Sequence, residues 1–594
     1  MGRIWRTGAS PRAAALLVFA PVLVLLLSTL HCADAATPAE AGHQRAVAAQ
    51  RRRDARAKVP NRLVEGRRAQ LLGDEGPVNA NEAKALAAAA AKAAALKARK
   101  FLGTQPSWPR FFDVSARSGL SQLRTLKFGG PVVADLDQDG HYDLVLPQHN
   151  DPNATRVYWS NGDGTFRMGP QVKPGWTDVH GITAGQLRLS GQQSLDLLVT
   201  LGGSNGESPS SPVMYRFGKD NSLVEESAAT GVNARAMRGR SPRFMDLNQD
   251  GKLDVVFVNY ERTGSYKGAR QMVYRNTGGG RMRVQANTRF EAADAEQALV
   301  CDVDGDGIPD LLTWPWPRLY RSSGDFKFDD VTEEMLWTFG GPPALAAGLK
   351  GIRAVAELDY DNDGKMDLYI AREFGSNDVL LRNMGGYYAD VSRAAKLPYH
   401  GDHRGVTVGD VNNDGFMDVM VFRYGPARWA DLILINQGDG TFQTTKDHGA
   451  VVSGTNGRGD MGQFFVADGD GKLDLLMGNG DHDSVWAKGT WSMFRNALPD
   501  RWSGNYLIVQ VGKAWGDSAA ALGAVVKVDI GGEVVLTRRV GSAGASYSQS
   551  RLNIVHFGVG KVGEVLSVEV KWTNGKTAKK LKVKANSRIK MGKF

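Results

Sequence analysis

A nine-residue acidic pattern recurs along the chain and constrains its fold more than any other feature. It first occurs as DLDQDGHYD, and the five complete copies begin at Asp135, Asp246, Asp302, Asp359 and Asp410. A shortened copy, ADGDGKLD, ends at Asp474, and a degenerate copy, LRLSGQQSLDLLV, lies between the first two complete ones. The units step by roughly 51–58 residues, which is the length of a four-stranded propeller blade.

The segments around each acidic loop predict β-strands. A short apolar run leads into each loop and a second one leaves it, as in DLVLP, DVVFV and DLYIA. Next come runs such as RVYWSNGDGTF, whose turn residues indicate hairpins. The segment FFDVSARSGL resembles the ends of internal units but precedes the first unit. We therefore expect a strand from this segment to complete the last blade and close the ring, which removes exposed sheet edges.

The chain divides into four zones by composition. Residues 1–35 combine three arginines, an apolar run and a small-x-small site, which predicts a secretory signal peptide. The alternative is an uncleaved signal anchor that tethers the protein to a membrane. Residues 36–106 form a basic, Ala-rich leader, which we expect to be a solvated helical or disordered stalk because it has few large apolar residues. Residues 107–503 hold the repeats, and residues 504–594 predict a small antiparallel β-domain.

Charge is distributed unevenly along these zones. The chain has a formal net charge of +10. About +10 lies in the first 106 residues and another +10 or so in the last ninety, so the repeat region is near −10. Because the positive charge lies outside the repeats, we do not expect nucleic-acid binding, and membrane contact is expected only through the basic leader. If the signal is cleaved, Cys301 is the single cysteine left, and we expect it to be buried and inert.

The acidic loops have the chemistry of sites for a hard divalent cation. Calcium takes six to eight oxygen ligands, mostly carboxylates and carbonyls. Side chains at positions 1, 3 and 5 converge if the chain turns sharply at position 6, where glycine accepts a positive φ. Position 7 offers its carbonyl oxygen. An Asp at position 9 closes the loop early, whereas the closing acid of an EF-hand waits until position 12. The exit from the loop can therefore be a strand.

We predict five calcium sites, each with four side chains and one carbonyl. The predicted ligands are Asp135, Asp137, Asp139 and Asp143 with the carbonyl of His141; Asp246, Asn248, Asp250 and Asp254 with Lys252; Asp302, Asp304, Asp306 and Asp310 with Ile308; Asp359, Asp361, Asp363 and Asp367 with Lys365; and Asp410, Asn412, Asp414 and Asp418 with Phe416.

Asn at position 3 removes a charge, so we expect weaker binding in the Asp246 and Asp410 loops. The copy at 468–474 has Val466 at position 1 and is expected to bind weakly or not at all. The alternative is that the loops are ordinary Asp/Asn/Gly turns on a solvated surface.

The repeats resemble the integrin-alpha-type FG-GAP/VCBS family, and the segments LGAVVKVDIGG, GASYSQS, VHFGVG and VKWTNGKT resemble the ASPIC/UnbV domain. The pairing is similar to that of the cartilage acidic protein family of secreted, calcium-binding matrix glycoproteins. The resemblance covers about residues 109–590. It implies an all-β fold with a seven-bladed propeller, calcium in the loops and an extracellular location. The eroded second unit, the truncated seventh loop and the basic leader depart from the family pattern, and no EGF-like cysteine module is present.

Other motifs give weaker indications. Asn153 lies in an NAT sequon, which predicts N-glycosylation in a secreted protein. GRGD at 457–460 contains an adhesion triplet, but it aligns with the Arg404-Gly405 pair of the sixth unit, so we interpret it as a repeated turn. His400 and His403 lack the intervening Glu of a metalloprotease helix.

We therefore predict no catalytic residues and expect a binding or adhesion module for an extracellular protein or glycan, not an enzyme. Two alternatives stay open. One is an extracellular hydrolase or lyase acting on polysaccharide or phospholipid, and the other is a structural component of a cell surface or wall.

Overall fold

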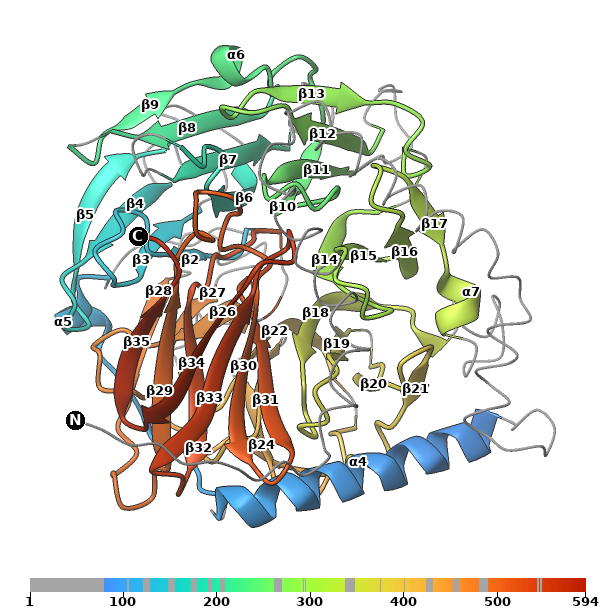
Figure 1. The fold of residues 1–594 in the computed structure, drawn as a ribbon, viewed down its shortest axis with the longest axis vertical. Coiled ribbons are helices and arrows are strands. Elements are labelled where there is room, and N and C mark those ends of the chain that lie inside the picture. The colour runs from blue at the N-terminus through green and yellow to red at the C-terminus, as the bar shows by residue number, and fades with distance from the viewer. Residues whose placement is uncertain are drawn as a thin grey trace, which may run out of the picture. The chain divides into compact units, whose positions relative to one another are not determined.

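Strands β1 to β28 form seven four-stranded antiparallel sheets among the described residues (Figure 1). The structure is a computed structural model. It describes residues 80–594 apart from 104–105, 121–128, 148–154, 173–178, 191–194, 203–208, 219, 261–269, 292, 294, 337–347, 374, 400, 424–430, 452–458, 480–489, 542–543 and 545–546. The predicted signal peptide, most of the leader, Asn153 and His400 lie outside the described residues.

Each sheet corresponds to one repeat of the sequence. In chain order the strands are β2–β5 (Val132–Ala134, Asp143–Leu146, Arg156–Ser160, Phe166–Gln171), β6–β9 (Val179–Gly185, Asp196–Leu201, Val213–Phe217, Leu223–Glu225), β10–β13 (Gly239–Met245, Asp254–Asn259, Met272–Asn276, Met282–Gln285), β14–β17 (Gln297–Cys301, Asp310–Trp314, Arg318–Ser322, Phe328–Asp330), β18–β21 (Ile352–Leu358, Asp367–Arg372, Val379–Asn383, Tyr388–Asp390), β22–β25 (His403–Gly409, Asp418–Arg423, Leu432–Asn436, Phe442–Thr445) and β26–β28 (Gly459–Phe465, Asp474–Asn479, Trp491–Asn496). Short helices follow some outer strands: α5 (Ser115–Ser118), α6 (Ser227–Thr230) and α7 (Thr332–Met335).

The first strand of each sheet lies innermost and contacts its counterpart in the neighbouring sheet, as β6 does with β10 and β18 with β22. Every described residue of β6 and β10 is buried, as expected for strands that are covered on both faces. Cys301 ends the innermost strand β14 and is buried, as predicted. Burial raises the pKa of its thiol well above the ordinary value. The predicted all-β propeller architecture is therefore confirmed.

The ring closes through a strand from the N-terminal side. β1 (Phe111–Asp113) pairs antiparallel with β28, with Phe111 opposite Asn496 and Asp113 opposite Phe494. The last sheet thus has the order β1-β28-β27-β26. This confirms the closing strand that the sequence predicts. The register also corrects the alignment of GRGD with the sixth unit. His403 and Gly459 occupy equivalent places at the starts of β22 and β26. The Arg-Gly pairs of the two units are therefore offset by two residues and are not equivalent.

Residues 505–594, which we name the cap domain, form two further sheets. Their strands are β29 (Asn505–Val511), β30 (Val525–Gly531), β31 (Val534–Arg539), β32 (Ile554–Gly560), β33 (Glu564–Lys571), β34 (Thr577–Lys584) and β35 (Ser587–Met591). The sheet orders are β32-β29-β35 and β31-β30-β33-β34. All pairs are antiparallel, as expected, except β29 with β35, which is parallel.

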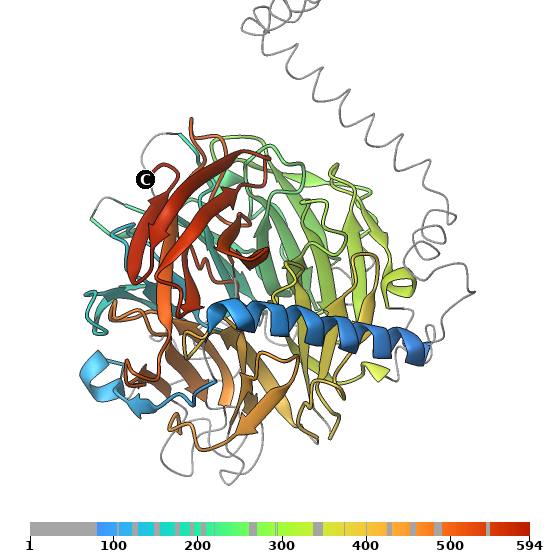
Figure 2. The same cartoon turned by 60° about the horizontal axis from the view of Figure 1, so that its bottom comes forward.

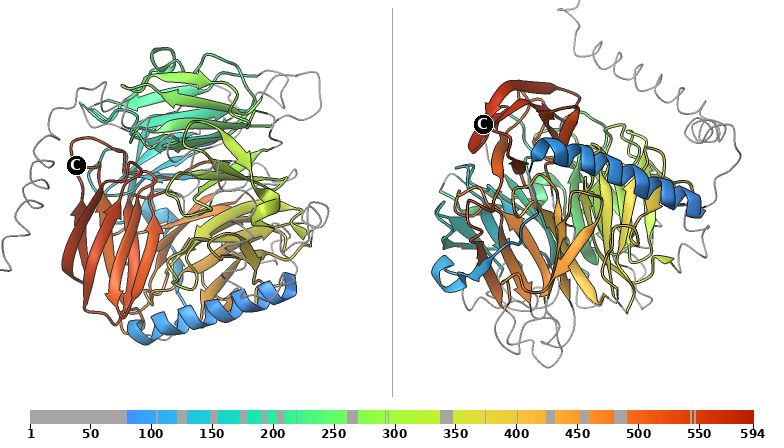
Figure 3. Two further views of the ribbon diagram at one scale, coloured as in Figure 1. Left: turned by 45° about the vertical axis from the view of Figure 1, so that its right-hand side comes forward. Right: turned by 90° about the horizontal axis from the view of Figure 1, so that it is seen from below.

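The cap domain inserts part of its chain into the propeller. The segment 547–551 runs beside the innermost strands, where Gln549 forms a parallel bridge with Thr183 and Arg551 forms one with Ala134. The hydroxyl groups of Ser548 and Ser550 accept the backbone N–H groups of Ile182 and Val133, at 3.1 and 3.0 Å. Figures 1 and 3 show the red strands of the cap domain lying over one side of the ring. The cap domain and propeller therefore share hydrogen bonds deep inside the ring.

Helix α4 (Ala80–Leu102) packs along the propeller and the cap domain, which corrects the expectation of a solvated stalk (Figure 2). Its buried residues are Ala83, Ala87, Ala91, Ala95, Ala98 and Leu102. Residues three or four apart share one helix face, so these alanines form a flat stripe that lets the helix approach closely. Ala91 packs in the same apolar cluster as Phe442. Lys97 forms an ion pair of 2.8 Å with Glu533 of the cap domain.

In the described part of the chain, no helix is both long enough and apolar enough to cross a bilayer.

The packing of α4 predicts a position-dependent effect of added volume. Ala91→Leu should lower the free energy of unfolding by about 1–3 kcal/mol, because the extra atoms have no room on the buried stripe. Ala93→Leu makes the same chemical change on the exposed face and should alter stability by less than about 0.5 kcal/mol. Urea denaturation of both variants measures the difference. Equal stability of the two variants would show that α4 does not dock in solution.

Candidate cation sites and the domain that covers them

The five complete acidic loops share one internal hydrogen-bond pattern. In each, the position-1 carboxylate accepts the N–H of the position-6 glycine, at 2.7–3.2 Å. The position-5 carboxylate accepts the N–H of position 7, at 2.7–3.0 Å. The position-6 glycines all have positive φ, as at Gly140 (101°) and Gly415 (94°). The chain therefore curls around the carboxylates as the sequence predicts.

The position-9 Asp has a structural role in all seven repeats. One of its oxygens accepts the position-2 N–H of its own loop, at 2.9–3.2 Å. In six repeats the other oxygen accepts a backbone N–H at or just after the third strand, at 2.7–2.9 Å. Asp196 occupies this place even in the eroded second loop. An acid at position 9 is therefore required by the blade itself, and it does not by itself indicate a cation.

Sequence reasoning missed the role of position 4. Gln138, Gln249, Asn362 and Asn413 have φ between 56° and 63° there. Three of these side chains donate to the position-6 carbonyl of the next loop: Gln249 to Gly307 at 3.1 Å, Asn362 to Gly415 at 3.0 Å and Asn413 to Gly471 at 3.1 Å. The available signal was the recurrence of Asn and Gly at this position, since both tolerate positive φ. Three pairs of neighbouring loops are thus joined by a side-chain hydrogen bond.

Three of the five predicted sites bring three carboxylate oxygens within 4.8 Å of one another. The groups are Asp135, Asp137 and Asp143; Asp302, Asp304 and Asp306; and Asp359, Asp361 and Asp367. The predicted ligands Asp139, Asp310 and Asp363 belong to the same loops but not to these groups. The Asp246 and Asp410 loops have Asn at position 3, so they form no such three-acid group among the described residues.

Burial makes the negative charge of these groups costly. Burial raises the pKa of Asp135 to about 6 and that of Asp143 to about 8, and neighbouring Asp137 adds to both shifts. Buried like charges at this spacing repel one another unless a positive charge lies between them. A hard divalent cation supplies that charge and prefers carboxylate oxygens. The donor sets of the Asp135, Asp302 and Asp359 loops therefore fit calcium.

Arginine side chains lie on carboxylates in three of the loops. The eroded second loop is two residues longer than the others, since Leu187 makes the position-2 bond to Asp196. Arg188 therefore takes position 3, and it forms an ion pair with Asp196. In the truncated seventh loop, Arg495 lies 2.9 Å from Asp468. In these two loops a guanidinium supplies positive charge directly to a loop carboxylate. Arg382 also contacts Asp361 and Asp363 of the Asp359 loop, both at 2.7 Å. Two of the five predicted calcium ligands of this loop are therefore also bound to a guanidinium.

The cap domain covers the ring of acidic loops. Cap-domain donors reach loop carbonyls in four repeats: Arg588 to Gly140, Lys513 to Leu189 at 2.8 Å, Ala520 to Gly251 at 3.0 Å and His556 to Gly471 at 3.1 Å. Others reach position-1 carboxylates: Gln510 lies 3.2 Å from Asp135 and Thr573 lies 2.6 Å from Asp246. The basic cap domain thus faces the acidic side of the propeller, which matches the opposite charges of the two zones.

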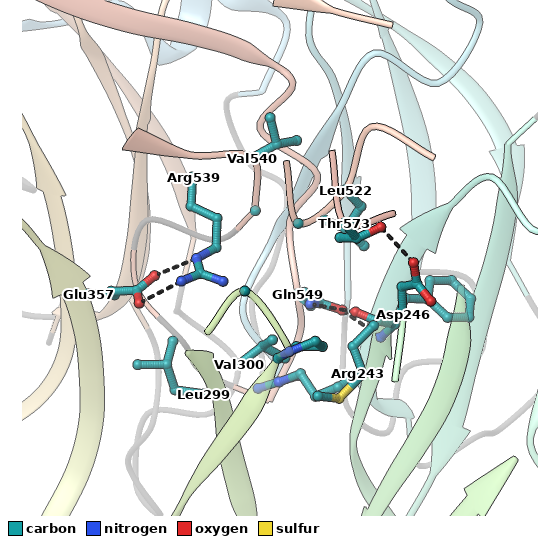
Figure 4. A pocket seen from close by; sticks show the side chains of 16 residues that line it. Arg243, Asp246, Leu299, Val300, Glu357, Leu522, Arg539, Val540, Gln549 and Thr573 are labelled. Atoms are coloured by element: carbon teal, nitrogen blue, oxygen red, sulfur yellow. Dashed lines mark hydrogen bonds and ion pairs between the residues drawn. The ribbon is translucent and has the colours of Figure 1, made fainter. Parts of the chain in front are cut away.

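A cavity of about 50 Å³ lies between the propeller and the cap domain (Figure 4). Its wall includes Glu357, which accepts from Arg539 at 3.0 and 3.3 Å, and Asp246, which accepts from Thr573. The side chain of Gln549 accepts the backbone N–H of Phe244 at 2.8 Å and donates to the carbonyl of Phe244 at 3.3 Å. The volume is of the order of two water molecules. The two carboxylates of the wall are thus engaged by the cap domain.

The fold and loops define a repeat propeller with a C-terminal β-domain, and comparison with known proteins agrees. The family model described as FG-GAP-like repeat matches residues 135–188, 246–313 and 359–421. The model described as ASPIC and UnbV matches residues 516–593. The chain therefore combines FG-GAP-like repeats with an ASPIC/UnbV domain, as the sequence motifs predict.

The chain is homologous to cartilage acidic protein 1. It is 25% identical to the protein of Homo sapiens, over 75% of this chain and 69% of the relative. It is 24% identical to the protein of Xenopus tropicalis, over 75% of this chain and 70% of the relative. Among solved structures, BBS1N in complex with ARL6DN, soaked with lead, matches 67% of this chain and 98% of that chain at 9% identity and a TM-score of 0.38.

Substitutions can separate the structural role of the position-9 Asp from its predicted role as a calcium ligand. Asp474→Asn puts an amide N–H against one of two backbone donors, so it should lower the free energy of unfolding by about 1–3 kcal/mol. The loss should be the same with calcium and with chelator, because position 1 of that loop is Val466. Asp367→Asn should also destabilise, but more strongly in calcium than in chelator. Guanidinium denaturation in both buffers measures this. A calcium-dependent loss in Asp474→Asn would contradict the assignment.

Proposed function

We propose that this protein is a secreted, calcium-binding propeller that acts as an extracellular binding or adhesion module for a protein or glycan partner. The observation that carries the calcium proposal is the convergence of three carboxylate oxygens within 4.8 Å in each of three loops. Homology to cartilage acidic protein 1 and the FG-GAP-like repeats support the same proposal. The predicted signal peptide supports secretion.

In this proposal calcium stabilises the ring rather than contacting the partner. The acidic loops lie beneath the cap domain, where donors such as Gln510 and Thr573 reach their carboxylates. In three places a position-4 side chain joins one loop to the next, so a cation that orders one of these loops also supports its neighbour. Partner binding is then expected on surfaces other than the loop face, and glycosylation at Asn153 remains part of the proposal.

Calcium binding can be tested with a substitution that already occurs naturally in two of the loops. Asn naturally occupies position 3 in the Asp246 and Asp410 loops, so Asp137→Asn and Asp304→Asn remove one charge while an oxygen is kept. Each should weaken calcium binding at one site by roughly tenfold, since fewer charged ligands bind less tightly. Their stability in chelator should stay within about 0.5 kcal/mol of the original protein.

Isothermal titration of the chelated protein with calcium measures these affinities. Asp447→Asn removes an exposed acid outside the loops and serves as the matched control, with no expected change. Absence of calcium binding by the unmodified protein would contradict the calcium proposal. Unchanged binding in both position-3 variants would show that calcium binds elsewhere.

The binding role and the absence of catalysis are tested together. The purified protein in calcium is applied to arrays of extracellular glycans and proteins, and hydrolysis products are measured in the same samples. We expect stable binding to at least one array component and no turnover. Turnover of a polysaccharide or phospholipid would favour the hydrolase or lyase alternative, and no binding to any component would favour a purely structural role.

A further inference from the structure

Two arginines of the cap domain lie buried above the acidic loops without a directly bonded carboxylate. Arg538 of β31 is 6% exposed, and Arg551, just before β32, is 3% exposed. Nη1 of Arg538 donates to its own neighbour Thr537 at 2.9 Å, and its guanidinium lies 5.3 Å from the ring centre of Phe557. Its Nε and Nη2 have no hydrogen-bond partner among the described residues, and the same holds for Nε and Nη1 of Arg551. Buried charges of this kind need an opposite charge nearby.

The opposite charge for Arg538 comes from two neighbouring loops. Burial raises the pKa of both Asp359 and Asp410, and the guanidinium of Arg538 opposes the rise in each. The cap domain comes very close at this point: a side chain on Gly558 of β32 would lie 1.9 Å from Oδ2 of Asp410. Gly558 belongs to the VHFGVG motif, and this close approach explains why that position is a glycine. Thr537, whose carbonyl accepts from Nη1 of Arg538, has its hydroxyl oxygen 4.0 Å from the place that a side chain on Gly364 of the Asp359 loop would take. Arg538 therefore lies where the cap domain contacts both the Asp359 loop and the Asp410 loop.

The same carboxylates are predicted calcium ligands, and their oxygens remain within the loops. Those of Asp359 accept the N–H groups of Asp363 and Gly364, both at 3.0 Å, and those of Asp410 accept the equivalent N–H groups at 3.0 and 2.7 Å. These hydrogen bonds come from the carboxylates' own loops, so any effect of Arg538 on the carboxylates acts through space. Arg551 donates its backbone N–H to the carbonyl of Val133 at 3.1 Å and forms a bridge with Ala134, the residue before Asp135. It opposes the rise that burial causes in the pKa of Asp135.

We propose that Arg538 and Arg551 are built-in counter-ions of the cap domain that set the calcium affinity of the loops beneath them, Arg538 for the Asp359 and Asp410 loops and Arg551 for the Asp135 loop. This inference rests on the proposed calcium binding. A guanidinium and a divalent cation that act on one carboxylate repel each other. Each arginine therefore lowers calcium affinity while it stabilises the cation-free protein. The Asp246 loop differs because its position-1 carboxylate meets the neutral hydroxyl of Thr573.

The test compares charge-removing and charge-keeping variants. Arg538→Gln should tighten calcium binding at two sites by roughly tenfold, as expected for loss of one unit charge at several ångströms in a partly buried site. Its melting temperature in chelator should fall. Arg538→Lys keeps the charge and should restore the original affinity. Arg551→Gln should tighten one site only. Thr573→Val removes a neutral donor and should not tighten the two sites that Arg538 governs.

Calorimetric titration with calcium and thermal melts in chelator measure these effects on the full chain. If Arg538→Gln does not fold, Arg551→Gln decides the question with its single site. Unchanged or weaker calcium binding in the charge-removing variants, while the original protein binds calcium, would overturn this inference alone. Absence of calcium binding in the original protein would instead overturn the proposed function.

Discussion

One buried carboxylate at position 9 holds each blade together, and the rest of the structure depends on it. In six of the seven repeats it joins the loop after the first strand to the backbone N–H of the last residue of the third strand, so a single side chain connects three of the four strands. The bonds are charge-assisted and buried, which makes them stronger than neutral ones. Asp196 keeps the loop bond although the cation-binding positions of its unit are lost. The cation loops are therefore additions to a blade that is already closed.

The second constraint is electrostatic. The propeller concentrates carboxylates on one face, and three kinds of positive charge would balance them: the calcium that we propose for the complete loops, arginine within the second and seventh loops, and the basic cap domain above. Arg188 and Arg495 show the second kind, and Arg538, with no directly bonded carboxylate, shows the third. Residues 547–551 of the cap domain also lie beside the innermost strands of the propeller. The cap domain is therefore an integral part of the propeller structure rather than a separate module.

The repeats were readable from sequence because each acidic loop and its flanking apolar runs are local signals. The closing strand was also readable, since residues 111–120 repeat the end of an internal unit. The docking of helix α4 was not, because an Ala-Lys composition does not reveal that a stripe of alanines packs against the rest of the protein. The cap domain itself was predicted, but its docking was not: the opposite charges of residues 107–503 and 504–594 were visible, and nothing local says that they face each other. Arg382 shows the same limit within one loop, because only the folded blade brings it to Asp361.

The most direct measurement is anomalous X-ray diffraction from crystals grown in calcium. The account predicts anomalous peaks within the Asp135, Asp302 and Asp359 loops, weaker peaks in the Asp246 and Asp410 loops, and none beside Asp196, where Arg188 forms the ion pair. A peak beside Asp196, or no peak in any of the three loops whose carboxylates converge, would contradict it.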